Sequence, residues 1–280
     1  MGVNLQSLKL FLDLRKNKKI YSGDLLILGK QEFGLNLDEV KKKFSLKNLK
    51  SAKESNIIDD RLFFKYLSKN IKKIDILDIR KNVGANIFLD LNEPIGKKYH
   101  NKYDFIYDGS VLDNIFNPAQ AIINLSNMLK RGGTIVSINN SSFAPGVFTA
   151  LSPEFFYSFY ALNKFKHCEV FLTVQKAKQI KKNHYPTDLY IYSPFYKKNK
   201  KYDFFKFSTD YNGVCRTMVV ATKGNIKSLA LKKPTNLHYI TKNKENYLKQ
   251  KYSRKYLKYK PQIKQTKLLY SHYTLLKTNF

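Results

Sequence analysis

The stretch from Tyr103 to Asn140 constrains the fold of this chain most, because a strand-like pattern is followed there by a helical one. The run YDFIY is β-branched and aromatic and ends in Asp108-Gly109, which is typical of a buried strand that stops at a turn. From Pro118 onward, apolar residues recur at the three- and four-residue steps that predict a helix with one buried face. A strand followed by an amphipathic helix is therefore expected here.

The end of this helix is expected at Arg131-Gly132-Gly133, because glycine readily adopts the positive φ of a helix C-terminus. The apolar run from Thr134 to Ile138 follows as a second buried strand. Strand, helix and strand in close succession form a βαβ unit, in which the two strands lie parallel and the helix crosses one face. The chain is thus predicted to contain an open α/β sheet.

The segments YDFIYDGSVLDNIF and LKRGGTIVSI resemble the fourth strand, the next helix and the fifth strand of the class I S-adenosylmethionine-dependent methyltransferases. In that family a turn of leucine, lysine, any residue and two glycines often precedes an apolar strand. The segments GDLLILGKQ, ILDI and NIFLDLNEPI resemble the first, second and third strands. The resemblance covers roughly residues 22 to 175 and extends to RTMVVATK. It implies a Rossmann-like three-layer fold, with a mostly parallel central sheet and an antiparallel last strand.

The resemblance also implies a site for S-adenosylmethionine at the carboxyl ends of the strands, where ligands collect in open α/β sheets. Gly29 ends the first predicted strand and Asp78 ends the second. A carboxylate in the place of Asp78 can accept hydrogen bonds from both ribose hydroxyls, and Asp75 is an alternative for this role. Asp90 follows the third strand and would face the adenine amino group, with Leu91 covering the ring.

Asp108 and Gly109 end the fourth strand and would lie beside the methionyl part of the cofactor. Asp108 and Asp113 are the candidates for a general base to an acceptor hydroxyl. Methyl transfer is an in-line displacement, so a protein of this kind mainly has to position the acceptor and exclude water. The motif of asparagine, two prolines and tyrosine that accompanies amino-group methylation of bases is absent. This favours a small-molecule, sugar or glycan acceptor.

The first turn departs from the family pattern. Ile27 stands where the family has an acidic residue, and Gln31 stands where a second glycine is expected. Lys30, Gln31 and Glu32 could offer polar side chains to the carboxylate or ammonium of an amino acid. An ordinary strand-to-helix turn without any binding role is the alternative.

Three functions remain open from the sequence. The first is an S-adenosylmethionine-dependent methyltransferase acting on a small molecule or sugar. The second is an RNA methyltransferase that holds RNA through a basic C-terminal tail. The third is a Rossmann-like binding module without chemistry, suggested by the altered first turn. A nicotinamide dehydrogenase is disfavoured, because no G-x-G-x-x-G follows a predicted strand.

The net charge of +30 invites a nucleic-acid interpretation, because clustered cations release counterions from a phosphate backbone. Of the 51 basic residues only six are arginine, although sites built for phosphate recognition favour the guanidinium fork. The lysine excess accompanies abundant asparagine, isoleucine, tyrosine and phenylalanine, as an AT-rich genome would produce. Much of the charge therefore has an explanation other than a partner.

The chain is divided here into an N-terminal helical segment (1–21), a Rossmann-like domain (22–223) and a basic, Tyr/Lys-rich extension (224–280). An insertion at about 175–210 would cover the substrate, which makes His184, Tyr185 and Tyr190 possible acceptor contacts. In the extension, Tyr252, Tyr256 and Tyr259 recur at helical spacing among lysines. This stripe could dock on the domain, or bind RNA or an anionic membrane surface.

Other elements are expected from their local patterns. Residues 35–73 are predicted to be helical, and Asn139–Ser142 to form a polar turn. Residues 151–165 are predicted to form a helix that Ser152 caps and Pro153 begins. The strand CEVFLTV should follow it, and 216–223 should form the last strand.

Two cysteines, Cys168 and Cys215, cannot form a disulfide framework or a zinc site by themselves, so we expect two small buried residues and no metal. No segment reaches the roughly 20 uninterrupted apolar residues of a membrane helix. The N-terminus lacks the apolar core and cleavage site of a signal peptide. A cytoplasmic protein is the expectation, and its oligomeric state is left open.

Overall fold

In a computed structural model, the chain forms two compact units, Met1–Val136 and Ser137–Phe280. The structure describes residues 3, 5–15, 22–31, 38, 40–41, 60–81, 84–142, 146–175, 187–192, 214–224, 231–234, 269–270 and 273–277. The elements of the first unit are α1 (Leu5–Arg15), β1 (Gly23–Leu28), α3 (Asp60–Leu67), β2 (Ile71–Asp78), β3 (Ile87–Phe88), the 3-10 helix η1 (Lys97–Tyr99), β4 (Tyr103–Gly109), the 3-10 helix η2 (Leu112–Asn114) and α4 (Pro118–Met128). Strand β5 (Leu129–Asn140) begins in this unit and ends in the second.

The sheet of the first unit has the strand order β3-β2-β1-β4-β5. Strand β1 is parallel to both of its neighbours: Leu25–Leu28 pairs with residues 74–77 of β2 on one side and with residues 105–108 of β4 on the other. Strand β3 is parallel to β2. The strand order therefore reverses between β1 and β4, which is where open α/β sheets bind their ligands.

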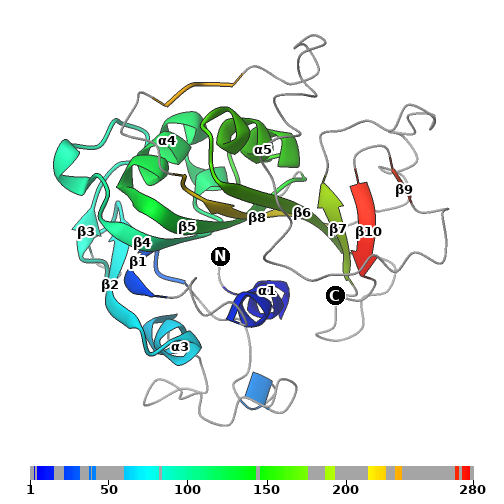
Figure 1. The fold of residues 1–280 in the computed structure, drawn as a ribbon, viewed down its shortest axis with the longest axis horizontal. Helices are drawn as coiled ribbons and strands as arrows, with labels where there is room; N and C mark the ends of the chain where they lie inside the picture. Colours follow the sequence, from blue (N-terminus) through cyan, green and yellow to red (C-terminus); the bar gives the residue numbers. More distant parts are fainter. Residues whose placement is uncertain are drawn as a thin grey trace. The chain divides into compact units, whose positions relative to one another are not determined.

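Helices cover both faces of this sheet, with α1 and α3 on one side and α4 on the other (Figure 1). The central strand β1 is almost wholly apolar, and its residues Leu25–Leu28 are buried. Phe11 of α1 makes edge contacts with Phe64 of α3 and Tyr107 of β4, at ring-centroid distances of 5.3 and 4.9 Å. The N-terminal helix is therefore part of the core of the first unit.

Helix α4 begins as predicted. Asn117 caps it by accepting a hydrogen bond from the amide of Gln120 (3.1 Å), and Pro118 stands in its first turn. The predicted helix end at Arg131-Gly132-Gly133 is wrong, because the helix ends at Met128 and the backbone at Leu129 is already extended. The glycines lie inside β5, so no glycine cap separates the helix from the strand.

Two other predicted boundaries are also wrong. Residues 71–73 belong to β2 and not to a helix, because Ile71 and Lys73 pair with Gly23 and Asp24 of β1. The polar turn was expected to include Asn139 and Asn140, but both are buried at the end of β5. Strand pairing overrides the local preference of these polar residues. Most of the predicted helix between residues 35 and 59 lies outside the described residues.

The described elements of the second unit, besides the end of β5, are α5 (Pro153–Leu162), β6 (His167–Gln175), β7 (Thr187–Tyr192), β8 (Cys215–Thr222), β9 (Leu269–Tyr270) and β10 (Tyr273–Lys277). The strand order here is β5-β8-β6-β7-β10-β9, and β6 is antiparallel to both β8 and β7. Ser152 caps α5 as predicted, by accepting from the amide of Phe155 (3.3 Å). The predicted α/β Rossmann-like fold is confirmed, with parallel pairing in the first unit and antiparallel pairing among the later strands.

The C-terminal extension is not wholly separate from the second unit, because β10 pairs antiparallel with β7. The tyrosine stripe from Tyr252 to Tyr259 lies outside the described residues, as do His184 and Tyr185. Tyr190 is fully buried in β7. The boundaries proposed at residues 22 and 223 stay predictions.

The expectation of two buried cysteines holds for Cys168, whereas Cys215 is only half-buried. Cys168 is buried in β6, and burial raises its pKa well above the ordinary value. Burial also raises the pKa of Cys215 to about 11. Within the described residues, no cluster of His, Cys, Asp or Glu side chains has a composition that could hold a metal ion. No helix in the described part of the chain is long and apolar enough to cross a membrane.

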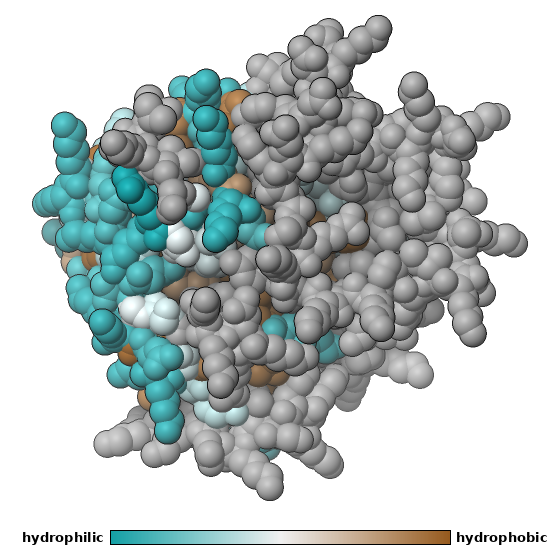
Figure 2. Space-filling view, in the orientation of Figure 1, coloured by the Kyte–Doolittle hydropathy of each residue, from teal (hydrophilic) through white to brown (hydrophobic). Residues whose placement is uncertain are grey.

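The described surface on the face in Figure 2 is mostly hydrophilic, and hydrophobic residues show in small areas. Few large apolar side chains are exposed among the described residues. They are Leu62, Ile79, Phe88, Phe116 and Phe148.

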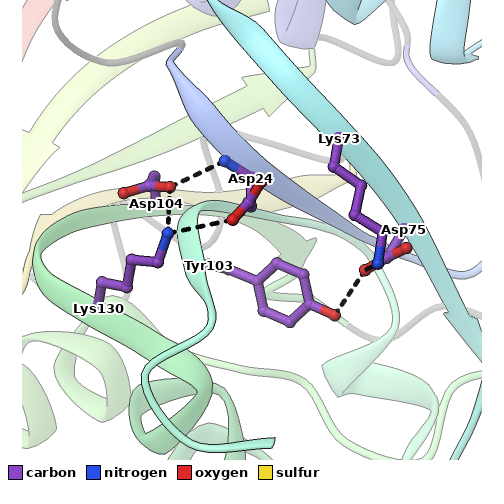
Figure 3. A network of polar contacts seen from close by, with 6 residues as sticks. All are labelled: Asp24, Lys73, Asp75, Tyr103, Asp104 and Lys130. Carbon is purple, nitrogen blue, oxygen red and sulfur yellow. Dashed lines mark hydrogen bonds and ion pairs between the residues drawn. The ribbon is translucent and has the colours of Figure 1, made fainter.

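A polar network joins the amino ends of β1, β4 and β5 (Figure 3). Lys130 Nζ lies 3.1 Å from Asp24 Oδ2 and 2.7 Å from Asp104 Oδ2, and the amide of Asp24 donates to the same Asp104 oxygen. Gly23 has a φ of +75°, and a side chain there would collide with the Asp104 carboxylate. The amino ends of these strands are therefore joined by side chains.

Asp75 of β2 is buried beside this network and is fully partnered. It accepts hydrogen bonds from Tyr103 Oη (3.0 Å) and Asn86 Nδ2 (2.6 Å), and it pairs with Lys73 Nζ (2.9 Å). Burial by itself raises the pKa of Asp75, but the hydrogen bonds from Lys73, Asn86 and Tyr103 outweigh it, so the pKa lies below its ordinary value. Asp75 is thus bonded to three side chains of the protein, which favours a structural role for it.

Removing the Tyr103 hydroxyl should reveal this pKa shift. Tyr103→Phe should lower the free energy of unfolding at pH 7 by about 1.5–3 kcal/mol, the usual range for a hydrogen bond to a charged group. A depressed carboxylate pKa contributes stability above the unfolded value, and this contribution is lost as pH falls through the folded pKa. The effect of Tyr103→Phe should therefore shrink as pH is lowered through the depressed pKa of Asp75, as measured by urea unfolding at a series of pH values.

Tyr99→Phe is the matched control, because Tyr99 is only half-buried on η1, and the free energy of unfolding should change by less than about 0.5 kcal/mol. A loss for Tyr103→Phe that grows as pH is lowered would contradict the assigned charge on Asp75.

Candidate functional site

A cavity of about 290 Å³ lies at the carboxyl ends of β1, β2, β3 and β4, wholly within the first unit. It lies beside the reversal in strand order between β1 and β4. Its wall consists of Gly29, Lys30, Gln31, Leu77, Asp78, Ile79, Arg80, Leu89, Asp90, Leu91, Asn92, Gly109, Ser110, Val111, Asn114 and Ile115. Four separate loops therefore meet around one hollow.

Every residue predicted to bind the cofactor lines this cavity except Asp108. The lining members of that set are Gly29, Lys30, Gln31, Asp78, Asp90, Leu91 and Gly109. Parallel pairing explains why they meet, because it places the carboxyl ends of β1, β2, β3 and β4 at the same edge of the sheet. The structure brings these residues together, and their binding roles stay predictions.

Gly29 forms the turn after β1 with a φ of +64°, a conformation that favours glycine. Its amide donates to the carbonyl of Leu77 (2.7 Å), so the turn remains tied to β2. A side chain at Gly29 would also lie close to Val111 and Asp78. Glycine at this position therefore allows the positive φ of the turn and leaves space in the cavity that a side chain would occupy.

Asp78 is one of two carboxylates that line the cavity, and only 9% of its side chain is exposed. Arg80 contacts both of its oxygens: the backbone amide and Nε donate to Oδ1 at 2.9 and 3.2 Å, and Nη2 donates to Oδ2 at 3.3 Å. Burial by itself raises the pKa of Asp78, but Arg80 outweighs it and the pKa lies below its ordinary value. Asp78 is therefore an ionised hydrogen-bond acceptor facing the hollow.

Arg80 is a lining residue that sequence reasoning missed. Its side chain is 68% exposed, so this ion pair is held by solvent-facing contacts that a ligand can replace. The spacing D-x-R after a predicted strand was the available signal.

The loop after β3 is organised by its own polar side chains. Asp90 Oδ1 accepts hydrogen bonds from the amide and the side chain of Asn92, at 2.9 and 2.8 Å. Asn92 Oδ1 in turn accepts from the amide of Asn117 (2.9 Å), the residue that caps α4. Leu91 is buried, so the loop presents a carboxylate and an apolar wall to the cavity.

Asn124 of α4 is hydrogen-bonded to the backbone of this loop. Sequence reasoning did not single it out. Its Nδ2 donates to the carbonyls of Leu91 (3.0 Å) and Glu93 (2.8 Å), and its Oδ1 accepts from the amide of Ile95 (3.3 Å) and from Gln120 (2.9 Å). Helical periodicity predicts an apolar residue at this buried position. A buried, fully bonded asparagine can be identified only once the loop that it contacts is placed.

Asp108 and Asp113 are buried, and neither lines the cavity. Asp108 Oδ1 accepts hydrogen bonds from the amides of Val111 (2.9 Å) and Leu112 (3.4 Å). Asp113 accepts from Ser110 Oγ (2.6 Å) and from Asn114 Nδ2 (2.8 Å). These contacts brace the turn after β4, and a role for either carboxylate in proton transfer stays a prediction.

The Gln31 side chain fills the position where sequence reasoning expected the open space of a second glycine. It is 4% exposed, and its Nε2 donates to the carbonyl of Leu28 at 2.6 Å. Its backbone amide donates to Asp60 Oδ2 at the start of α3 (3.2 Å). Ile27 stands where the family resemblance expects an acidic residue. Its side chain is buried in β1, so this position offers no carboxylate to a ligand.

The role of Asn124 can be tested by stability measurements. Asn124→Ala removes four hydrogen bonds and leaves buried backbone carbonyls unpaired, so we expect a loss of about 2–4 kcal/mol in the free energy of unfolding. Amide hydrogen exchange should also rise in residues 91–95. The matched control is Asn127→Ala on the half-buried side of α4, which should change neither quantity. Unaltered exchange in the loop of the folded Asn124 variant would contradict the assignment.

No protein-family model matches the chain, and no curated protein matches it. Solved structures do show likenesses. A Zn-dependent alcohol dehydrogenase homologue from Rhodobacter sphaeroides has a TM-score of 0.32 at 13% identity, over 51% of this chain and 49% of that chain. This chain thus matches only about half the length of that protein.

Methyltransferases recur among the similar structures. A SAM-dependent methyltransferase from Archaeoglobus fulgidus has a TM-score of 0.41 at 11% identity, covering 77% of this chain and 94% of that chain. A phosphoethanolamine N-methyltransferase from Haemonchus contortus has a TM-score of 0.41 at 9% identity, covering 78% and 53%. All of these TM-scores are below 0.5, so the fold assignment rests on the strand order and pairing of the chain itself.

Proposed function

We propose that this chain is an S-adenosylmethionine-dependent methyltransferase of the class I type. The observation that carries the proposal is the place of Asp78, an ionised carboxylate at the end of β2 in a cavity beside the strand-order reversal. Carboxylates at this position of Rossmann-like sheets accept hydrogen bonds from ribose hydroxyls. The family resemblance of the four strand ends points to the same cofactor.

The lining residues fit a nucleoside. Leu89, Leu91 and Ile115 provide an apolar part for a base, and Asp78 provides an acceptor for a sugar. The two turns that border the reversal carry glycine, so backbone can approach a ligand closely there. Bound S-adenosylmethionine supplies a methyl group on a positively charged sulfur. The residues of this chain would hold and orient it and keep water out.

The acceptor is proposed to be a small molecule or a sugar hydroxyl. RNA, bound through the basic extension, is the alternative. The charged residues among those that line the cavity are Lys30, Arg80, Asp78 and Asp90, two bases and two acids. This described lining is not a strongly basic border of the kind that would guide a polyanion. It favours the smaller acceptor.

A nucleoside-binding module without methyl transfer is the second candidate. The buried Gln31 side chain favours it, because this side chain occupies space that a glycine would leave open for the amino-acid end of the cofactor. Both candidates require a bound nucleoside, and they differ in whether the methyl group is delivered to an acceptor.

Calorimetry with S-adenosylhomocysteine tests the nucleoside site. The protein should bind this ligand, and Asp78→Asn should weaken the affinity about 10- to 100-fold, because a charge-assisted acceptor becomes a neutral one. Glu93→Ala is the matched control, since it removes an exposed acid from the neighbouring loop without altering the cavity wall. Absence of any heat with the wild-type protein would refute both candidates, and an unchanged affinity in Asp78→Asn would refute the role of Asp78.

A further inference from the structure

One lining residue of the cavity carries an unsatisfied polar atom. Gln31 Nε2 donates to the carbonyl oxygen of Leu28 at 2.6 Å and approaches that of Gly29 at 3.5 Å. Two oxygens would not lie this close together, so the amide nitrogen must face Leu28 and the amide oxygen must point away. Within the described part of the chain, Gln31 Oε1 is buried and has no hydrogen-bond donor.

Gln31 Oε1 lies next to a second residue that lines the cavity, Gly109. Gln31 Oε1 lies against Gly109, where any side chain would collide with it, and the Tyr107 hydroxyl would be 2.8 Å from the same added atom. Gln31 and Gly109 both line the cavity, one after β1 and the other at the end of β4. An acceptor and a hydroxyl therefore converge on the two strands between which the strand order reverses.

The order of the strands fixes the direction of a bound nucleoside. Asp90 and Leu91 follow β3, Asp78 ends β2, and Gln31 follows β1. Since these strands are neighbours in that order, a ligand with its base near Leu91 and its sugar at Asp78 extends its remaining end toward Gln31. In S-adenosylmethionine that end is an amino acid, which carries a charged ammonium donor.

We propose that Gln31 Oε1 is the acceptor for the ammonium group of the cofactor's amino-acid end, and that it determines specificity for ligands with this group. The inference rests on the proposed function and adds a contact that a glycine at this position cannot make. A buried acceptor without a donor is unfavourable, and an ammonium from the ligand satisfies it. The Gln31 side chain thereby takes over recognition in a turn that lacks the family's acidic residue.

The test compares two ligands that differ only in this group. Calorimetry is performed with S-adenosylhomocysteine and with its analogue that has hydrogen in place of the α-amino group. The wild-type protein should bind the analogue about 10-fold more weakly. Gln31→Met keeps the size of the side chain but removes the acceptor, so it should abolish this preference to within about twofold. Gln31→Leu removes the acceptor in the same way and should also abolish the preference.

Two controls separate this inference from the proposed function. Adenosine reports on the nucleoside site alone, and its affinity should be the same in the wild-type protein and in Gln31→Met. Asp78→Asn should weaken the binding of S-adenosylhomocysteine and of its analogue by the same factor, so the ratio of the two affinities should stay unchanged. If adenosine does not bind the wild-type protein, the nucleoside site itself is refuted.

If adenosine binds, the affinity ratio of S-adenosylhomocysteine to its analogue can still be the same in the wild-type protein and in Gln31→Met. This result would refute the role of Gln31 and leave the nucleoside site standing. Tighter binding of S-adenosylhomocysteine to Gln31→Met would also overturn the inference, since Gln31 would then obstruct the amino-acid end. Should Gln31→Met fail to fold, as judged by circular dichroism, Gln31→Leu decides: a preference that persists in that variant overturns the proposal.

Discussion

The parallel pairing of β1 on both of its sides is the constraint on which the first unit depends. Leu25–Leu28 form a buried apolar strand, and a strand of this kind is stable only when both edges and both faces are covered. Because β2 and β4 run in the same direction, the turns after all three strands emerge at one edge. The site is therefore a consequence of the sheet, and its residues come from segments far apart in the chain.

The carboxylates of this sheet differ in how exposed their partners are. Asp24 and Asp104 at the amino ends share Lys130, and Asp75 in the middle of β2 pairs with Lys73 and accepts a hydrogen bond from Tyr103 (Figure 3). At the carboxyl ends, Asp78 relies on one largely exposed arginine. A ligand hydroxyl can replace solvent-facing contacts of this kind at little cost, whereas it could not displace the buried partners of Asp75. This contrast supports the proposal that Asp78 accepts a hydrogen bond from a ligand.

The sequence predicts the strands and the strand ends of the first unit well, because a buried parallel strand is a short apolar run that stops at a polar turn. It predicts boundaries poorly where pairing decides them, as at Ile71 and Leu129. It misses Arg80 and Asn124, since each acts through a partner that only the folded chain brings near. Gln31 is intermediate: its departure from the family pattern is visible in the sequence, but its buried oxygen is visible only in the structure.

The central claim is that the carboxyl ends of β1, β2, β3 and β4 form one nucleoside site. Amide NMR spectra recorded while S-adenosylhomocysteine is added to the isotopically labelled protein test it most directly. We expect the largest shifts at the backbone amides of Gly29, Asp78, Leu91 and Gly109, with little change at Asp24 and Asp104 on the opposite edge. Shifts that gather at the opposite edge, or at none of these positions, would contradict the claim.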